Sequence, residues 1–169
     1  MEFLQMSPEA LKELIECTVF TLVTTGIAAF CIVARRKCDN DIKEMVLDML
    51  NNAYEFSIGE FFSLRTYQFD GLGIYGYSNC NFEGVYVIFN KTKKKCFVGS
   101  SKYVVDAISA HLEGTGDKEL YRDYKKDNIF SVRMIKLKGS GFDKTKEFEK
   151  YLKNACADYC ALYQAKKPR

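Results

Sequence analysis

The sequence has no tryptophan, one histidine and two prolines, and its seven cysteines include no Cys-X-X-Cys pair. A structural zinc site takes four cysteine or histidine ligands, usually in closely spaced pairs, so these absences argue against one. An odd number of cysteines without a regular spacing argues against a secreted disulfide scaffold and indicates a reducing compartment. Cys156 and Cys160 lie four residues apart, and we expect two small buried apolar side chains rather than a metal or redox pair.

Charge is unevenly divided along the chain. Residues 1–83 contain 6 Lys+Arg and 12 Asp+Glu, for a net charge of −6, whereas residues 84–169 contain 19 and 10, for +9. A basic half is what a protein that binds a phosphate backbone needs. A solvated lysine-rich surface would give the same numbers, so charge alone is only a hint.

An uncharged stretch covers residues 17–34 and is followed by Arg35-Arg36-Lys37. Eighteen residues is a minimal transmembrane length, and the basic flank predicts that the domain after it is cytoplasmic and anchored to the membrane by this helix. The acidic segment before it is unlike a cleavable signal. Four threonines leave a second interpretation open, namely a buried helix, or strands broken at Gly26, in a soluble cytoplasmic protein.

After this N-terminal segment (1–38), residues 39–83 form a lead-in, that is, the segment that precedes the main domain. Asp41–Tyr54 is predicted to be an amphipathic helix that begins at Asn40 or Asp41, and 56–81 reads as irregular structure with short strands. A separate domain is expected over 84–164, and residues 165–169 form a basic tail.

Two short strands and a helix are predicted at the start of that domain. Val85–Phe89 and Cys96–Val98 are apolar, and the polar segment 90–95 joins them as a hairpin tip. Gly99-Ser100-Ser101 is expected to end the second strand. Ser101 is then expected to cap a helix whose apolar positions are Val104, Val105, Ile108 and Leu112.

The remaining elements follow from turn and cap signals. Gly114-Thr115-Gly116 should end the helix, and Asp117 should cap the next one. Ile129–Leu137 alternates like a strand, residues 138–141 form a turn, and Asp143–Tyr163 is predicted to be one long helix.

A family resemblance runs through these elements. Gly84-Val85-Tyr86, ten residues, and then Phe97-Val98-Gly99 resemble the two half-motifs of the GIY-YIG nucleases, whereas the literal triplet Gly73-Ile74-Tyr75 lies too far from Phe97 to pair with it. The similarity covers Gly84 to Gln164. It implies an α+β fold with a small central antiparallel β-sheet flanked by helices.

The resemblance also implies functional residues. Tyr86 would help to activate the attacking water, Glu149 would hold one Mg²⁺, and His111 would be an accessory group. Each has a simpler interpretation: Tyr86 as strand packing, His111 as a satisfied semi-buried histidine, and Glu149 as solvated surface, with Glu147 as the alternative equivalent.

Two positions depart from the family pattern. Ala107 stands where the family places an arginine, next to Asp106, and Phe97 replaces a tyrosine. Loss of one preorganised electrostatic donor costs about 3–4 kcal/mol in a transition state. The resemblance therefore implies a DNA endonuclease, or a weakened descendant of one. The alternative is a catalytically inactive protein of the same fold that binds nucleic acid or serves as a membrane-tethered interaction protein.

The basic residues predict how DNA would be held. We expect contact mainly with the phosphate backbone and little reading of sequence, since no arginines occur at a spacing suited to base edges. Tyr103 and Tyr121 are candidates for stacking on splayed bases. The predicted DNA-binding residues, on one hairpin edge and a following helix, are Lys91, Lys93, Lys94, Lys95, Lys102, Arg122, Lys125 and Lys126.

Overall fold

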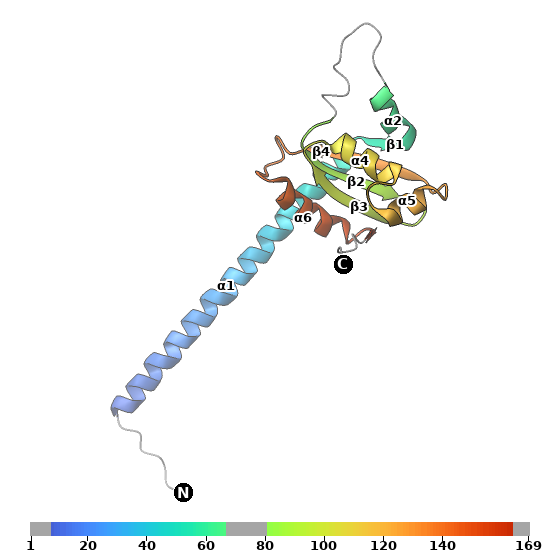
Figure 1. Ribbon diagram of the computed structural model, residues 1–169. Coiled ribbons are helices and arrows are strands. Elements are labelled where there is room, and N and C mark those ends of the chain that lie inside the picture. Colours follow the sequence, from blue (N-terminus) through green and yellow to red (C-terminus); the bar gives the residue numbers. More distant parts are fainter. Residues whose placement is uncertain (1–7, 67–80, 164–169) are drawn as a thin grey trace. The chain divides into compact units, whose positions relative to one another are not determined.

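The computed structural model describes residues 8–66 and 81–163 (Figure 1). The chain divides into two compact units, Met1–Asp41 and Ile42–Arg169. The second unit contains the whole β-sheet and begins well before Gly84, where the sequence placed the start of the domain.

The first helix, α1, runs from Pro8 to Asn52 without interruption. The sequence predicted a separate helix beginning at Asn40 or Asp41, and this boundary is wrong. No proline or glycine occurs between Gly26 and Asn52, so nothing in this part of the chain breaks the helical hydrogen bonds.

The apolar segment of α1 was predicted to cross a membrane. Within the part of the chain that the structure describes, no helix is long and apolar enough to do so. The predicted transmembrane helix at 17–34 and the membrane anchor are therefore not supported. Its four threonines reduce the hydropathy of the segment, and Thr25 donates its hydroxyl to the carbonyl of Thr21. The side chains of Cys17, Val19, Leu22 and Val23 lie outside the described residues.

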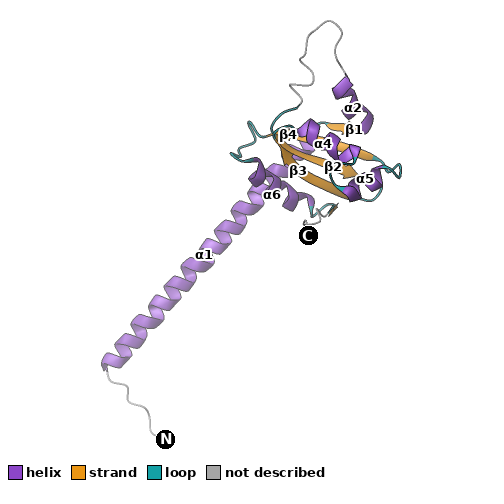
Figure 2. Cartoon of the chain, in the orientation of Figure 1, coloured by secondary structure: helices purple, strands orange, loops and turns teal. Residues whose placement is uncertain are grey.

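Five strands form one mixed sheet in the order β1-β4-β2-β3-β5 (Figure 2). The strands are β1 (Glu55–Ser57), β2 (Gly84–Asn90), β3 (Lys95–Ser101), β4 (Phe130–Lys136) and β5 (Ala161–Leu162). The first four pair antiparallel, as predicted, and β5 pairs parallel to β3. The α+β class is confirmed, with a mixed rather than a purely antiparallel sheet.

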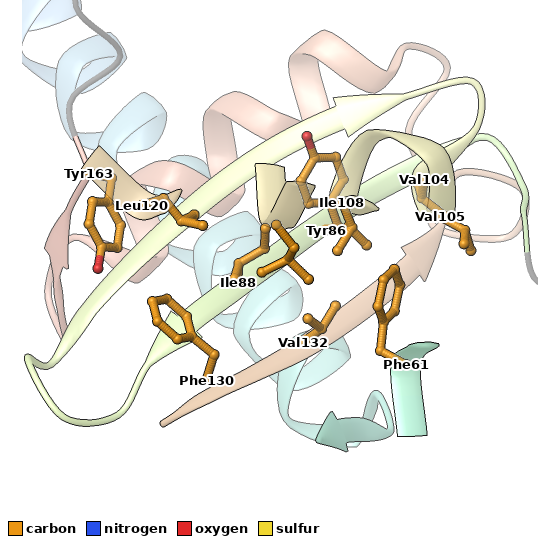
Figure 3. Packing of buried hydrophobic residues seen from close by; sticks show 11 residues of the cluster. Phe61, Tyr86, Ile88, Val104, Val105, Ile108, Leu120, Phe130, Val132 and Tyr163 are labelled. Carbon is orange, nitrogen blue, oxygen red and sulfur yellow. The ribbon is translucent and has the colours of Figure 1, made fainter. Parts of the chain in front are cut away.

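Helices cover both faces of the sheet, so the central strand β2 is buried on both sides. One face carries α2 (Ile58–Thr66), α4 (Val104–Glu113) and α5 (Lys118–Tyr124), and its core includes Tyr86 and Ile88 (Figure 3). The other face carries α6 (Thr145–Cys156) and the end of α1, whose Val46 and Leu50 pack with Val85 and Val87. Successive residues of β2 thus enter different cores.

The hairpin and the following helix agree with the prediction except at their ends. β3 continues through Gly99-Ser100-Ser101, because its pairing with β2 extends to Ser101 opposite Gly84. The start of α4 is capped from a distant segment: Asn81 Oδ1 accepts from the backbone N–H of Val105 at 2.9 Å. Ser101 instead accepts from the N–H of Tyr103 at 3.0 Å.

The turn signals that follow are confirmed. Gly114 ends α4 with φ at +95°. Asp117 caps α5, since its side chain accepts from the N–H of Leu120 at 2.8 Å.

The last helix is shorter than predicted. α6 ends at Cys156, and the chain then turns into β5. A disulfide between Cys96 and Cys160 joins β3 to the end of this turn. The expectation that Cys160 is simply a small buried side chain is therefore wrong, whereas Cys156 is a buried free thiol, as expected.

The lead-in is more regular than predicted, since β1 and α2 occupy 55–66. The literal triplet Gly73-Ile74-Tyr75 and the basic tail lie outside the described residues.

Candidate functional site

A pocket of about 240 Å³ opens beside the second half of β3. β5 pairs with β3 only at Lys95 and Cys96, so this strand's edge is left without a partner strand from Phe97 onward among the described residues. Side chains from both sheet faces reach the pocket. The residues that line it are Tyr86, Phe97, Val98, Gly99, Ser100, Lys146, Glu149, Lys153, Leu162 and Tyr163.

Tyr86 reaches the pocket because its cross-strand neighbour is glycine. Tyr86 on β2 lies opposite Gly99 on β3. A Cβ at position 99 would lie 2.5 Å from the Cζ and hydroxyl of Tyr86, closer than atoms can approach. Only glycine therefore lets this ring cross β3 toward the sheet edge.

His111 on α4 meets the hydroxyl of Tyr86. His111 Nε2 lies 3.1 Å from Tyr86 Oη. On its other side the ring accepts at Nδ1 from the backbone N–H of Asp117, at 2.9 Å. A neutral imidazole carries one N–H, so the proton lies on Nε2 and is donated to the tyrosine oxygen.

The pKa values of this pair agree with that assignment. Burial lowers the pKa of His111, which keeps the ring neutral near pH 7. Burial, and to a lesser degree the charge of Glu149, raises the pKa of Tyr86 above its ordinary value. Tyr86 therefore holds its own proton at neutral pH.

Glu149 comes from α6 on the opposite face of the sheet and is almost fully buried. Ser100 Oγ donates to its Oε2 at 2.5 Å. Lys146 Nζ donates to the same oxygen at 2.9 Å, and Lys153 Nζ donates to Oε1 at 2.5 Å. The alternative equivalent, Glu147, is exposed and does not line the pocket.

These donors keep Glu149 charged. Burial alone would raise the pKa of the carboxyl group, but the hydrogen bonds from Lys153, Ser100 and Lys146 outweigh it, so the pKa is lowered. The lysines themselves remain open to solvent, with side chains 80% exposed for Lys146 and 44% exposed for Lys153.

The implied Mg²⁺ does not fit this donor set. Mg²⁺ takes six oxygen ligands and repels other cations. Both oxygens of Glu149 already accept hydrogen bonds, two of them from ammonium groups. In the described ranges, 8–66 and 81–163, no three His, Cys, Asp or Glu side chains gather where they could hold a metal.

The two departures from the family pattern leave apolar surface. The Phe97 ring packs against His111, with centroids 4.2 Å apart, and offers no hydroxyl. Ala107 packs against the core on the Tyr86 face of the sheet. Its neighbour Asp106 accepts from Asn81 Nδ2 at 2.9 Å at the start of α4.

Most of the predicted DNA-binding residues gather at the hairpin tip and α5, but many are paired with acids. Lys93 pairs with Asp123 at 2.6 Å and Lys95 with Glu119 at 2.8 Å, which brings the tip against α5. Lys91 pairs with Glu55. Lys94 and, on and after α5, Arg122, Lys125 and Lys126 are exposed.

One predicted member of this surface lies elsewhere. Lys102 follows Ser101, which is opposite the first residue of β2, so it lies at the open end of the hairpin. The prediction that Lys102 shares one hairpin edge with Lys91, Lys93, Lys94 and Lys95 is therefore wrong.

Sequence reasoning missed Ser100, Lys146 and Lys153. The lysines had a readable signal, because they flank Glu149 at spacings of three and four on one helix and so share its face. Ser100 had none, since it was assigned to a turn.

Comparison with known proteins gives one finding. Residues 82–160 match the model of the GIY-YIG catalytic domain. No curated protein and no solved structure matches the chain.

Proposed function

Since residues 82–160 match the model of the GIY-YIG catalytic domain, we propose that the protein hydrolyses phosphodiester bonds in DNA, as a weakened enzyme of that kind. The observation that carries this proposal is the convergence of Tyr86, Ser100 and Glu149 on one pocket, with His111 hydrogen-bonded to Tyr86. They come from strands and helices on both faces of the sheet. Two of them, Tyr86 and Glu149, bring buried polar groups to that point, which costs stability unless the groups are paired.

Tyr86 and His111 have different roles in proton transfer. Hydrolysis requires a water to lose a proton as it attacks phosphorus. The phenolate of Tyr86, formed when the hydroxyl loses its proton to solvent, would accept the proton of the attacking water. The Nε2–H of His111 would stabilise the phenolate oxygen by donating to it, so His111 acts as a positioning residue rather than as the base.

Ala107 and Phe97 support a second candidate function. Without a guanidinium at position 107 and a phenol at position 97, the pocket lacks two of the family's polar groups. A catalytically inactive protein that binds the DNA backbone through its basic half is consistent with the same fold and charge.

The test is a nicking assay of the full chain on supercoiled plasmid, with and without Mg²⁺. The raised pKa of Tyr86 predicts a rate that climbs by about tenfold per pH unit from pH 7 to 9 without a plateau, because the phenolate fraction rises with pH. Tyr86→Phe should remove both the activity and this dependence, and Glu149→Gln should slow nicking, because the carboxylate positions Lys146 and Lys153 at the pocket.

A rate unchanged by both substitutions would place the chemistry elsewhere. If the wild type binds DNA but does not nick it, the enzyme is excluded and the catalytically inactive DNA-binding protein is the function that remains. In that case Ala107→Arg is the decisive variant, since gained activity would identify a degenerate site on an intact scaffold.

A further inference from the structure

Two ammonium groups occupy the position at Glu149 where the family resemblance implies a metal ion. We propose that Lys146 and Lys153 form a phosphate clamp, which binds a nucleic-acid phosphate at the pocket directly and without a divalent cation. The proposal rests on the proposed function only in taking nucleic acid as the ligand.

The carboxylate of Glu149 acts as the anchor of this clamp. It is held from β3 by Ser100 and takes one ammonium on each oxygen, at 2.9 Å for Lys146 and 2.5 Å for Lys153. Its side chain is only 11% exposed, so the anchor is fixed while the lysines above it face solvent.

The charges and free donors of the cluster favour an anion over a cation. One carboxylate with two ammonium groups has a formal charge of +1. Each ammonium has three N–H donors, and one bond to Glu149 leaves two for a ligand. A phosphate oxygen would therefore meet several donors, whereas a divalent cation would have to displace both lysines.

The pocket gives the clamp its place beside Tyr86. Lys146, Lys153 and Tyr86 all line the same 240 Å³ space. A phosphate held there would lie next to the hydroxyl of Tyr86. The clamp also supplies positive charge to a pocket that lacks the arginine replaced by Ala107.

The same helix offers a matched control. Lys150 is exposed one residue after Glu149 and does not line the pocket, and Lys144 at the start of α6 does not line it either. Lys144→Ala/Lys150→Ala thus removes the same charge from the same helix as Lys146→Ala/Lys153→Ala. Circular dichroism and thermal unfolding of each variant would establish that it is folded.

The experiment measures binding of the full chain to a fluorescein-labelled DNA duplex by anisotropy, in EDTA and over a range of salt. Wild type should bind in EDTA. The Lys146/Lys153 double variant should bind about tenfold or more weakly, and its slope of log K against log salt should become shallower by about 0.9, for the one phosphate that the clamp neutralises. The Lys144/Lys150 variant should lose about threefold or less.

Glu149→Gln separates the clamp from a metal site. Under the proposal Glu149→Gln loosens Lys146 and Lys153 and weakens DNA binding to the same degree in EDTA and in Mg²⁺, because the carboxylate anchors the two lysines and holds no cation. Binding by the wild type that requires Mg²⁺ would overturn the proposal, as would a Mg²⁺ site seen by calorimetry in the wild type and absent in Glu149→Gln. Equal losses in the two lysine pairs would do the same.

The anisotropy experiment measures binding and not cleavage. Absence of hydrolysis in the nicking assay would contradict the proposed enzymatic function but not the phosphate clamp. Metal-dependent cleavage with unaltered binding by the Lys146/Lys153 variant would remove the clamp and leave the enzyme.

Discussion

At the scale of single residues, the position of Tyr86 depends on Gly99. Gly99→Ala would place a methyl group 2.5 Å from the Tyr86 ring, in a core where the ring has little room to move. We expect the free energy of unfolding to fall by about 1–3 kcal/mol, because overpacking forces side chains from their preferred rotamers. Urea denaturation monitored by circular dichroism would measure it.

Gly59→Ala is the control for this substitution. Gly59 lies in α2 with open space around the position of a Cβ. Alanine there should be neutral or stabilise the protein by up to about 1 kcal/mol, since alanine favours helix. Equal stability of the wild type and Gly99→Ala would show that Tyr86 does not lie over Gly99.

The sequence allowed part of the site to be predicted at this scale. Tyr86, His111 and Glu149 followed from the motif resemblance, and the structure brings Tyr86 into contact with His111 and into one pocket with Glu149. Two of the donors to these groups could not be predicted, because the N–H of Asp117 and the hydroxyl of Ser100 are placed by the loop after α4 and by the length of β3. Their roles depend on backbone geometry rather than on residue type.

At the scale of secondary-structure elements, the Cys96–Cys160 disulfide ties the chain after α6 to β3. It closes a loop of 64 residues in sequence separation. Bridges of this kind stabilise proteins by about 2–4 kcal/mol, mainly by restricting the unfolded chain. Addition of the reductant TCEP should therefore lower the urea midpoint of the wild type.

Cys160→Ser provides the comparison for the reductant. This variant should have a low midpoint in both conditions, because it has no bridge to lose. A wild-type midpoint that does not respond to TCEP, with reduction verified by thiol titration, would contradict a stabilising disulfide.

Element types were more predictable than element ends. The periodicity of 104–112 led to α4, since it reflects one buried face. The alternation of 129–137 led to β4, whose Phe130, Val132 and Met134 lie in or against the core on the Tyr86 face. The end of α6 at Cys156 was missed, because Tyr159 and Leu162 continue a helical spacing in sequence. Pairing of Ala161 and Leu162 with β3 provides the competing interactions that end the helix.

At the scale of the second compact unit, a sheet covered on both faces gives the site its two halves. Tyr86 and His111 belong to the face covered by α4, and Glu149 to the face covered by α6. They meet only at the edge of β3, where β5 stops short. The residues of the site thus depend on the packing of both cores rather than on one local motif.

Ion pairs that join different elements make this unit sensitive to acid. Glu55 on β1 accepts one hydrogen bond of 2.8 Å from Arg133 on β4, which also donates to the carbonyl of Leu50 on α1. Hydrogen bonds from Lys91 and Arg133 lower the pKa of Glu55 from 4.5 to about 2.

Because this pKa is lowered on folding, the stabilisation is present above pH 4.5 and is lost as the pH falls toward 2. We expect it to amount to about 1–2 kcal/mol, since Glu55 is partly exposed and solvent screens the pairs. Urea denaturation at pH 7, 5, 4 and 3 would measure the loss.

Glu55→Gln should be less stable at pH 7 and should lose less stability than the wild type below pH 4.5. The control Glu147→Gln removes an exposed carboxylate from α6 and should follow the wild-type curve, whereas a Glu55→Gln curve parallel to that of the wild type would contradict the role given to Glu55.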